Sequence, residues 1–313
     1  MAPPRRGSGS GNNGSPSSCF ASLVRFYQSS YASDYAGFTL LLVAYLYIQF
    51  FVEPFHRLFF VNDLNISYPH AKVERVPVAM NFVYALFVPL FVILLYNSVF
   101  NAHVHKHHVS VLGIAIALIL TSTVTDIVKN MVGRPRPDLL ARCSPAPGTP
   151  PNTLVSLEIC TETDHHRLHD GWRSFPSGHA SFAFAGLGYT SLFLAGQLKI
   201  FVLRNSGWSS SAAADTAPVH VRGDLGKILI CLAPLLGAAM IAISRCQDYR
   251  HDVYDVCTGA LLGWTIAYWS YRRYWPHLSS SYCDEPYPGP ASARSEGNDY
   301  DRIRDEEQGF RVD

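Results

Sequence analysis

Three short polar clusters in this 313-residue chain combine basic side chains with histidine and aspartate. Residues 129–137 read KNMVGRPRP, residues 176–179 read PSGH, and residues 244–255 read SRCQDYRHDVYD. Phosphate chemistry needs such a set, because cations balance the charge of the phosphoryl oxygens while an imidazole attacks phosphorus or transfers a proton. The clusters therefore predict a phosphate site, provided that the fold brings them together.

The basic residues of this set lie at the ends of apolar segments. A charge at the centre of a bilayer costs on the order of 3 kcal/mol, so Lys129, Arg136 and Arg245 need an anionic partner or water. A bound phosphate supplies that partner, since arginine can bind two of its oxygens and lysine adds a compact charge. We expect these three side chains to bind phosphate.

The PSGH sequence stands directly before an apolar segment. Gly178 permits a close approach of the backbone, and free N–H groups at a helix N-terminus favour an anion. Ser177 adds a hydroxyl donor to the same place. Taken alone, the four residues are better explained as a helix cap with Ser177 at the N-cap position. Their assignment to phosphate binding thus depends on the other two clusters.

The third cluster contains a histidine with a carboxylate at helical spacing. His251 and Asp255 are four residues apart, so on a helix the carboxylate can bind one imidazole nitrogen and leave the other free as a nucleophile. Asp248, three residues before His251, can make the same contact, and spacing does not choose between the two. A single pair of this kind is more often structural than catalytic.

Long apolar segments separate and position these clusters. A bilayer core of about 30 Å requires roughly 20 apolar residues per helix, and 48% of the residues are hydrophobic. We predict an all-α, polytopic bundle of six transmembrane helices, which would deliver all three clusters to one membrane face. The predicted spans are residues 36–52, 78–100, 109–131, 178–198, 226–244 and 255–275.

The remaining segments are polar. We expect disordered tails at residues 1–35 and 276–313 around a membrane domain at 36–275. Residues 1–18 lack an early apolar core, so the first span is expected to act as an uncleaved anchor. The formal net charge of +1 gives no indication of a nucleic-acid partner.

Histidine and cysteine residues outside the clusters give weaker signals. The histidines at 103–108 and 165–169 are interpreted as solvated loop residues, and no zinc-ligand spacing occurs, so no metal is expected. Cys143 and Cys160 flank the long loop at 134–177 and are compatible with a disulfide or with free thiols. Asn65 begins a glycosylation sequon that would be lumenal in this topology.

The order K-x6-RP, PSGH, SR-x5-H-x3-D resembles the type 2 phosphatidic acid phosphatase superfamily, with no motif position departing from the pattern. The similarity extends over about residues 36–275. DGWRSFPSGH and SRCQDYRHDVYD are similar to the lipid phosphate phosphatase branch, and ISYPHAKVERVP and YRRYWPHL to fungal diacylglycerol pyrophosphate phosphatases. The resemblance implies magnesium-independent hydrolysis of phosphatidate, lysophosphatidate or diacylglycerol pyrophosphate, without a cofactor.

The resemblance also implies a role for each residue. His251 would attack phosphorus, Asp255 would orient it, and His179 would protonate the leaving group. Water would then hydrolyse the phosphohistidine. The phosphate ligands would be Lys129, Arg136, Ser177, Gly178 and Arg245.

The implied setting is a multi-pass protein of an endomembrane (vacuole, Golgi or ER) or of the plasma membrane, surrounded by membrane lipids. Its site would face the lumen or exterior, and the sequence does not decide whether the chain forms a homo-oligomer.

Three other functions share features of this sequence. A transporter or channel would distribute charges through its spans, whereas residues 36–52 and 78–100 carry none. Haloperoxidase-like enzymes share a related pocket but are soluble. A lipid phosphotransferase would use the same intermediate with an alcohol in place of water. The sequence does not identify the preferred lipid phosphate.

Overall fold

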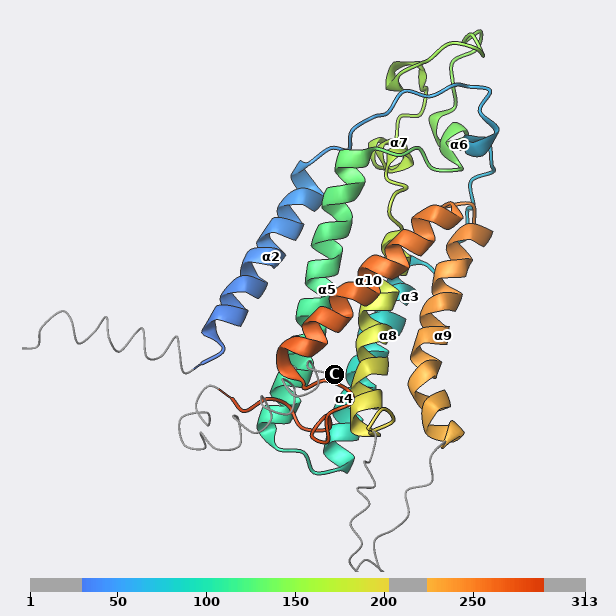
Figure 1. The fold of residues 1–313 in the computed structure, drawn as a ribbon. Coiled ribbons are helices and arrows are strands. Elements are labelled where there is room, and N and C mark those ends of the chain that lie inside the picture. The colour runs from blue at the N-terminus through green and yellow to red at the C-terminus, as the bar shows by residue number, and fades with distance from the viewer. Residues whose placement is uncertain (1–29, 203–223, 290–313) are drawn as a thin grey trace, which may run out of the picture.

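The computed structural model describes residues 30–202 and 224–289. Every regular element in this part of the chain is a helix, and two isolated β-bridges join loop residues. The long helices run side by side to form one bundle (Figure 1). They are α2 (Ala32–Phe51), α5 (Val104–Val132), α8 (Gly178–Gln197), α9 (Leu225–Gln247), α10 (Val253–Tyr274) and a continuous helix of α3 (Val78–Phe82), η2 (Val83–Phe87) and α4 (Val88–Val99).

These helices cover the six predicted segments, and the all-α prediction is confirmed. Four of them are long and apolar enough to cross a membrane: α2, the α3–α4 helix, α5 and α9. The helices α8 and α10 do not meet that measure, because α8 is rich in glycine, alanine and serine and α10 contains Asp255, Arg272 and Arg273.

Helix α5 begins at Val104, five residues earlier than the predicted start. Its first turn therefore contains His105 and His108, which bond to Tyr31 and Tyr35 through contacts of 2.8 and 2.6 Å. The prediction of a solvated turn is wrong for these two histidines.

Helix α8 lies at the centre of the bundle and contacts α5, α9, α10 and η2. Small residues make this close packing possible. A Cβ atom on Gly186 would lie 1.8 Å from the Ala85 carbonyl oxygen, and one on Gly263 of α10 would lie 2.1 Å from the Ser181 carbonyl oxygen. Because both contacts are with backbone, the start of α8 is held in a defined place.

The helix from Val78 to Val99 is interrupted by one π-helical segment, Val83–Phe87. Pro89 follows it and has no N–H to donate to the carbonyl four residues earlier, which is that of Ala85. The proline ring also crowds that carbonyl in a regular α-helix. The wider π turn is therefore the local consequence of Pro89, and Gly186 gives the Ala85 carbonyl room.

A cap of loops and short helices covers one end of the bundle (Figure 1). It contains η1 (Leu64–Ile66), α6 (Leu139–Cys143), η3 (Leu157–Ile159), α7 (His165–His169) and η4 (Asp170–Trp172). Trp172 is fully buried against Phe59, and its indole N–H donates to the Arg57 carbonyl at 2.9 Å. Cys143 and Cys160 form a disulfide, which the sequence left open.

At the other end, the packed part of the chain continues beyond the predicted domain boundary at 275. The buried Lys106 ammonium donates to the Asp284 carbonyl at 2.6 Å and contacts Glu285. The helix α2 likewise begins at Ala32, inside the predicted tail at 1–35. Residues 1–29 and 290–313 of the predicted tails and most of the loop at 199–225 lie outside the described residues.

Candidate active site

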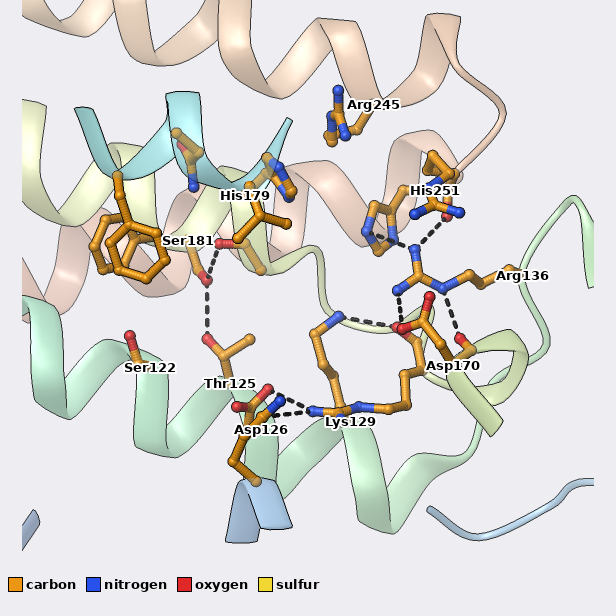
Figure 2. A pocket seen from close by; sticks show the side chains of 18 of the residues that line it. Ser122, Thr125, Asp126, Lys129, Arg136, Asp170, His179, Ser181, Arg245 and His251 are labelled. Carbon is orange, nitrogen blue, oxygen red and sulfur yellow. Dashed lines mark hydrogen bonds and ion pairs between the residues drawn. The ribbon is translucent and has the colours of Figure 1, made fainter. Parts of the chain in front are cut away.

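A cavity of about 380 Å³ lies beneath the cap and is lined by residues of α2, α3, α5, α8 and α9 and of the loops next to them. Six of the eight predicted site residues line it: Lys129, Arg136, Gly178, His179, Arg245 and His251. The labelled members of this set converge from separate elements on one space (Figure 2). The three sequence clusters thus meet, as the phosphate-site prediction required.

His251 lies in the short turn between α9 and α10 and is 4% exposed. Its Nε2 atom faces Arg136 Nη1 at 3.5 Å, and its Nδ1 atom lies 3.7 Å from Asp255 Oδ2. Asp248 instead accepts from Arg245 Nη2 at 2.9 Å and from the backbone N–H of Arg75 at 2.9 Å. The geometry therefore places Asp255, and not Asp248, behind His251.

Electrostatics keep this imidazole neutral. Burial, together with the nearby Arg136 and Lys129 cations, lowers the pKa of His251 well below its usual 6.5. An arginine N–H directed at Nε2 also favours the tautomer with its proton on Nδ1, on the Asp255 side. The Nε2 atom beside Arg136 thus keeps a lone pair, which is the group that attack on phosphorus requires.

Asp255 lies outside the cavity lining and is fully buried. Its carboxylate accepts from Ser174 Oγ at 2.5 Å and Arg134 Nη1 at 2.7 Å, and it completes a capping box with Asp252 at the start of α10. Several partners therefore hold the carboxylate that backs His251 in one position.

Arg136 is held by a residue that sequence reasoning missed. Its Nε donates to the Asp170 carbonyl at 2.8 Å and its Nη2 to Asp170 Oδ1 at 2.7 Å. Burial alone would raise the pKa of Asp170, but Arg136 and Arg142 hold it well below its ordinary value. A permanently ionised carboxylate thus fixes Arg136 with its third nitrogen beside His251.

Arg245 is 1% exposed and is bound on two sides. Asp248 holds Nη2, and Glu74 holds Nη1 at 2.9 Å while also binding Arg250. On the facing helix, Lys129 Nζ donates to the Arg173 carbonyl at 2.9 Å.

Gly178 brings the backbone at the start of α8 close to Lys129. A Cβ on Gly178 would lie 3.4 Å from Lys129 Cε, so the start of α8 is next to the ammonium. Ser177, by contrast, is fully buried and does not line the cavity. Its Oγ accepts from the Ala180 N–H as the N-cap of α8, and its own N–H donates to the Asp255 carbonyl at 2.9 Å.

Five further charged residues line the cavity: Glu74, Asp126, Asp170, Arg173 and Arg250. Asp170 and Arg250 lie within the DGWRSFPSGH and SRCQDYRHDVYD stretches, which was the only signal for them, and Glu74 lies in the first loop. With five cations and three carboxylates in total, the lining carries a net charge of +2. That charge complements a phosphate monoester dianion.

Metal ligands do not gather anywhere in the described chain: residues 30–202 and 224–289 contain no group of three histidine, cysteine, aspartate or glutamate side chains arranged to bind an ion.

Comparison with known proteins agrees with the residue patterns. The profile of the PAP2 superfamily matches residues 110–278. The chain is 40% identical to diacylglycerol pyrophosphate phosphatase 1 of Saccharomyces cerevisiae over 80% of each chain. It is 37% identical to a probable diacylglycerol pyrophosphate phosphatase 1 of Schizosaccharomyces pombe, covering 84% of this chain and 88% of the relative.

A plant relative extends the comparison. The chain is 34% identical to lipid phosphate phosphatase 2 of Arabidopsis thaliana, covering 76% of this chain and 75% of the relative. No solved structure matches the chain significantly.

Proposed function

The chain belongs to the PAP2 superfamily and is a lipid phosphatase, and from this premise we propose that it works through a phosphohistidine intermediate on His251. The observation that carries the proposal is the neutral Nε2 atom of a buried histidine, directed into a cavity of net charge +2. A neutral imidazole has the lone pair that attack on phosphorus requires, and the surrounding cations attract the phosphate.

The first half of the reaction transfers the phosphoryl group to the enzyme. His251 Nε2 attacks phosphorus, the bond from phosphorus to the lipid oxygen breaks, and His179 gives its proton to that oxygen. Lys129, Arg136, Arg245 and the Gly178 amide bind the phosphoryl oxygens, while Asp255 stabilises the Nδ1 proton of His251. Ser177 supports this arrangement through the N-terminus of α8.

The second half regenerates the enzyme. Water gives a proton to His179 and attacks phosphorus, the phosphorus–nitrogen bond breaks, and inorganic phosphate leaves. We propose that no magnesium is needed, because five cationic side chains already supply the positive charge around the phosphate. Phosphate release that EDTA abolishes would contradict this part of the proposal.

The substrates that we propose are phosphatidate, lysophosphatidate and diacylglycerol pyrophosphate. Two fungal relatives bear the name of the last of these, and a plant relative that of lipid phosphates in general. All three lipids end in a phosphate that the cavity can accommodate by charge.

We further propose that all six long helices cross the membrane, with the cap in the lumen or exterior of an endomembrane or the plasma membrane. The disulfide in the cap supports an oxidising compartment at that end. A reporter glycosylation site inserted between residues 146 and 153 tests the topology, and the absence of glycan there would contradict it.

The mechanism is tested by rapid quench with labelled substrate in detergent micelles. The wild-type protein should carry acid-labile label, and His251→Ala should lose both label and phosphate release. His165→Ala is the matched control, because this imidazole is mostly exposed and lies outside the cavity lining. Label on another residue, or full activity of His251→Ala or Arg245→Lys, would overturn the assigned roles.

A competing alcohol in the same assay separates hydrolysis from phosphotransfer. Hydrolysis predicts that the label appears as inorganic phosphate at every alcohol concentration. A phosphorylated alcohol as the main product would favour the phosphotransferase alternative.

A further inference from the structure

The active-site cavity extends beyond the cationic group. Its other walls include Phe82 and Phe182, whose rings pack edge to face with their centroids 4.9 Å apart. Ser122, Thr125 and Ser181 lie on the opposite side of His179 from Arg136 and His251 (Figure 2). A belt of neutral polar groups therefore adjoins the charged end of the cavity.

Two groups in this belt satisfy each other, whereas the neighbouring Asn81 has an unpaired atom. Thr125 and Ser181 share a hydrogen bond of 2.9 Å. Asn81 is 5% exposed, lines the same cavity, and its Oδ1 atom has no hydrogen-bond partner in the described chain. An unsatisfied buried amide costs roughly 1–3 kcal/mol, so a group that pairs with Asn81 on binding would recover this energy.

The backbone gives a reason for the position of Asn81. The π segment Val83–Phe87 begins directly after α3, and a π turn rotates the residues before it relative to those after it. The Ala85 carbonyl in that segment packs against Gly186 of α8. Because these contacts hold the segment in place, Asn81 is positioned by the scaffold and not by a mobile loop.

We propose that Asn81, together with Ser122, binds the free glycerol hydroxyl of a lysolipid phosphate, next to the phosphate ester. This inference rests on the proposed lipid phosphatase function. The unpaired Oδ1 atom of Asn81 is an acceptor, so it needs a donor, which the hydroxyl of lysophosphatidate supplies and the ester groups of phosphatidate do not. A plain alkyl phosphate has only methylene groups at that position.

The test compares two substrates in detergent micelles, oleoyl lysophosphatidate and oleyl phosphate, with the full-length protein. Asn81→Leu keeps much of the side-chain volume but removes the hydrogen bonds. It should lower kcat/KM for lysophosphatidate by about 3- to 30-fold, in line with one or two lost hydrogen bonds, and leave kcat/KM for oleyl phosphate unchanged. Ser122→Ala should act in the same direction with a smaller effect.

Asn97→Leu is the matched control, because Asn97 is also a buried asparagine with an unpaired Oδ1 but lies outside the cavity lining. It should leave the ratio of the two kcat/KM values at the wild-type level. If Asn81→Leu gives no folded protein, the same ratio of kcat/KM values is measured for Ser122→Ala instead.

An unchanged ratio in the folded variants would overturn the inference and leave the proposed function intact. Failure of the wild-type protein to release phosphate from either substrate would instead overturn the proposed function.

Discussion

Replacing Asp170 with asparagine isolates the role of the carboxylate that holds Arg136. Asparagine retains an oxygen that can accept from Arg136 Nη2, and the main-chain carbonyl still accepts from Nε. The negative charge is lost, and an amide NH2 takes the place of one carboxylate oxygen. Two arginines are affected, since Arg142 Nη1 also lies 3.1 Å from Asp170.

Two opposing effects follow from the loss of this charge. A charge-assisted hydrogen bond is roughly twice as strong as a neutral one. Because residue 170 then holds Arg136 less firmly, we expect the activation free energy to rise by about 1–2 kcal/mol. The net charge of the cavity lining also rises from +2 to +3, which strengthens attraction for phosphate. That attraction acts on bound substrate and transition state alike, so it lowers KM and does not raise kcat.

The expected result is therefore a fall in kcat of about 5- to 30-fold with an unchanged or lower KM. Asp170→Ala also removes the accepting oxygen and should lower kcat by about 100-fold or more. The assay is phosphate release from phosphatidate micelles. Glu162→Gln is the control, because Glu162 pairs with Arg167 at 2.8 Å in the same loop but outside the cavity lining. A wild-type kcat in folded Asp170→Asn would refute the assigned role of Asp170.

Three further predictions concern pH, the disulfide and the helix packing. Because the pKa of His251 is lowered, its Nε2 stays unprotonated as the pH falls, so the phosphoenzyme burst should persist well below pH 6.5; a burst amplitude that halves near pH 6.5 would contradict this. The disulfide closes a loop with a sequence separation of 17 and should contribute about 3 kcal/mol to the free energy of unfolding. Reductant should therefore lower the Tm of the wild type but not that of the Cys143→Ser/Cys160→Ser variant. Equal shifts of Tm in both proteins would contradict this prediction. Gly186→Ala should sharply reduce the yield of monodisperse protein, because its Cβ would lie 1.8 Å from the Ala85 carbonyl oxygen. Gly37→Ala is the control and should behave as wild type, since its Cβ would have no neighbour within 4 Å. Equal yields of the two variants would contradict the packing described for Gly186.

The helices and their order could be predicted because apolar run length is a local property. Helix length and apolar character mark α2 and α9 of the structure as candidate membrane spans, but not α8 or α10. These two carry residues of the site and small residues for close packing, which lowers their mean hydropathy. Their burial comes from neighbouring helices, which sequence periodicity does not report.

The site was predictable where residue type and spacing coincide with a helix end, as at Lys129, His179 and His251. Glu74 lies in a loop and Asp170 in the short helix η4, and both were missed because their contacts with Arg245 and Arg136 join positions far apart in the sequence. The choice between Asp248 and Asp255 also required coordinates, since both spacings fit a helix. The π turn at Val83–Phe87 was missed as well, although Pro89 was its visible cause.

The Glu74 carboxylate, shared by Arg245 and Arg250, has a consequence for the end of the catalytic cycle. When inorganic phosphate leaves, these two arginines still have an anionic partner in the low-dielectric cavity, because the Glu74 carboxylate remains bound to them. Product release then becomes an exchange of one oxyanion for another. Such an exchange favours rapid turnover over retention of the product, even in a cavity built to attract phosphate.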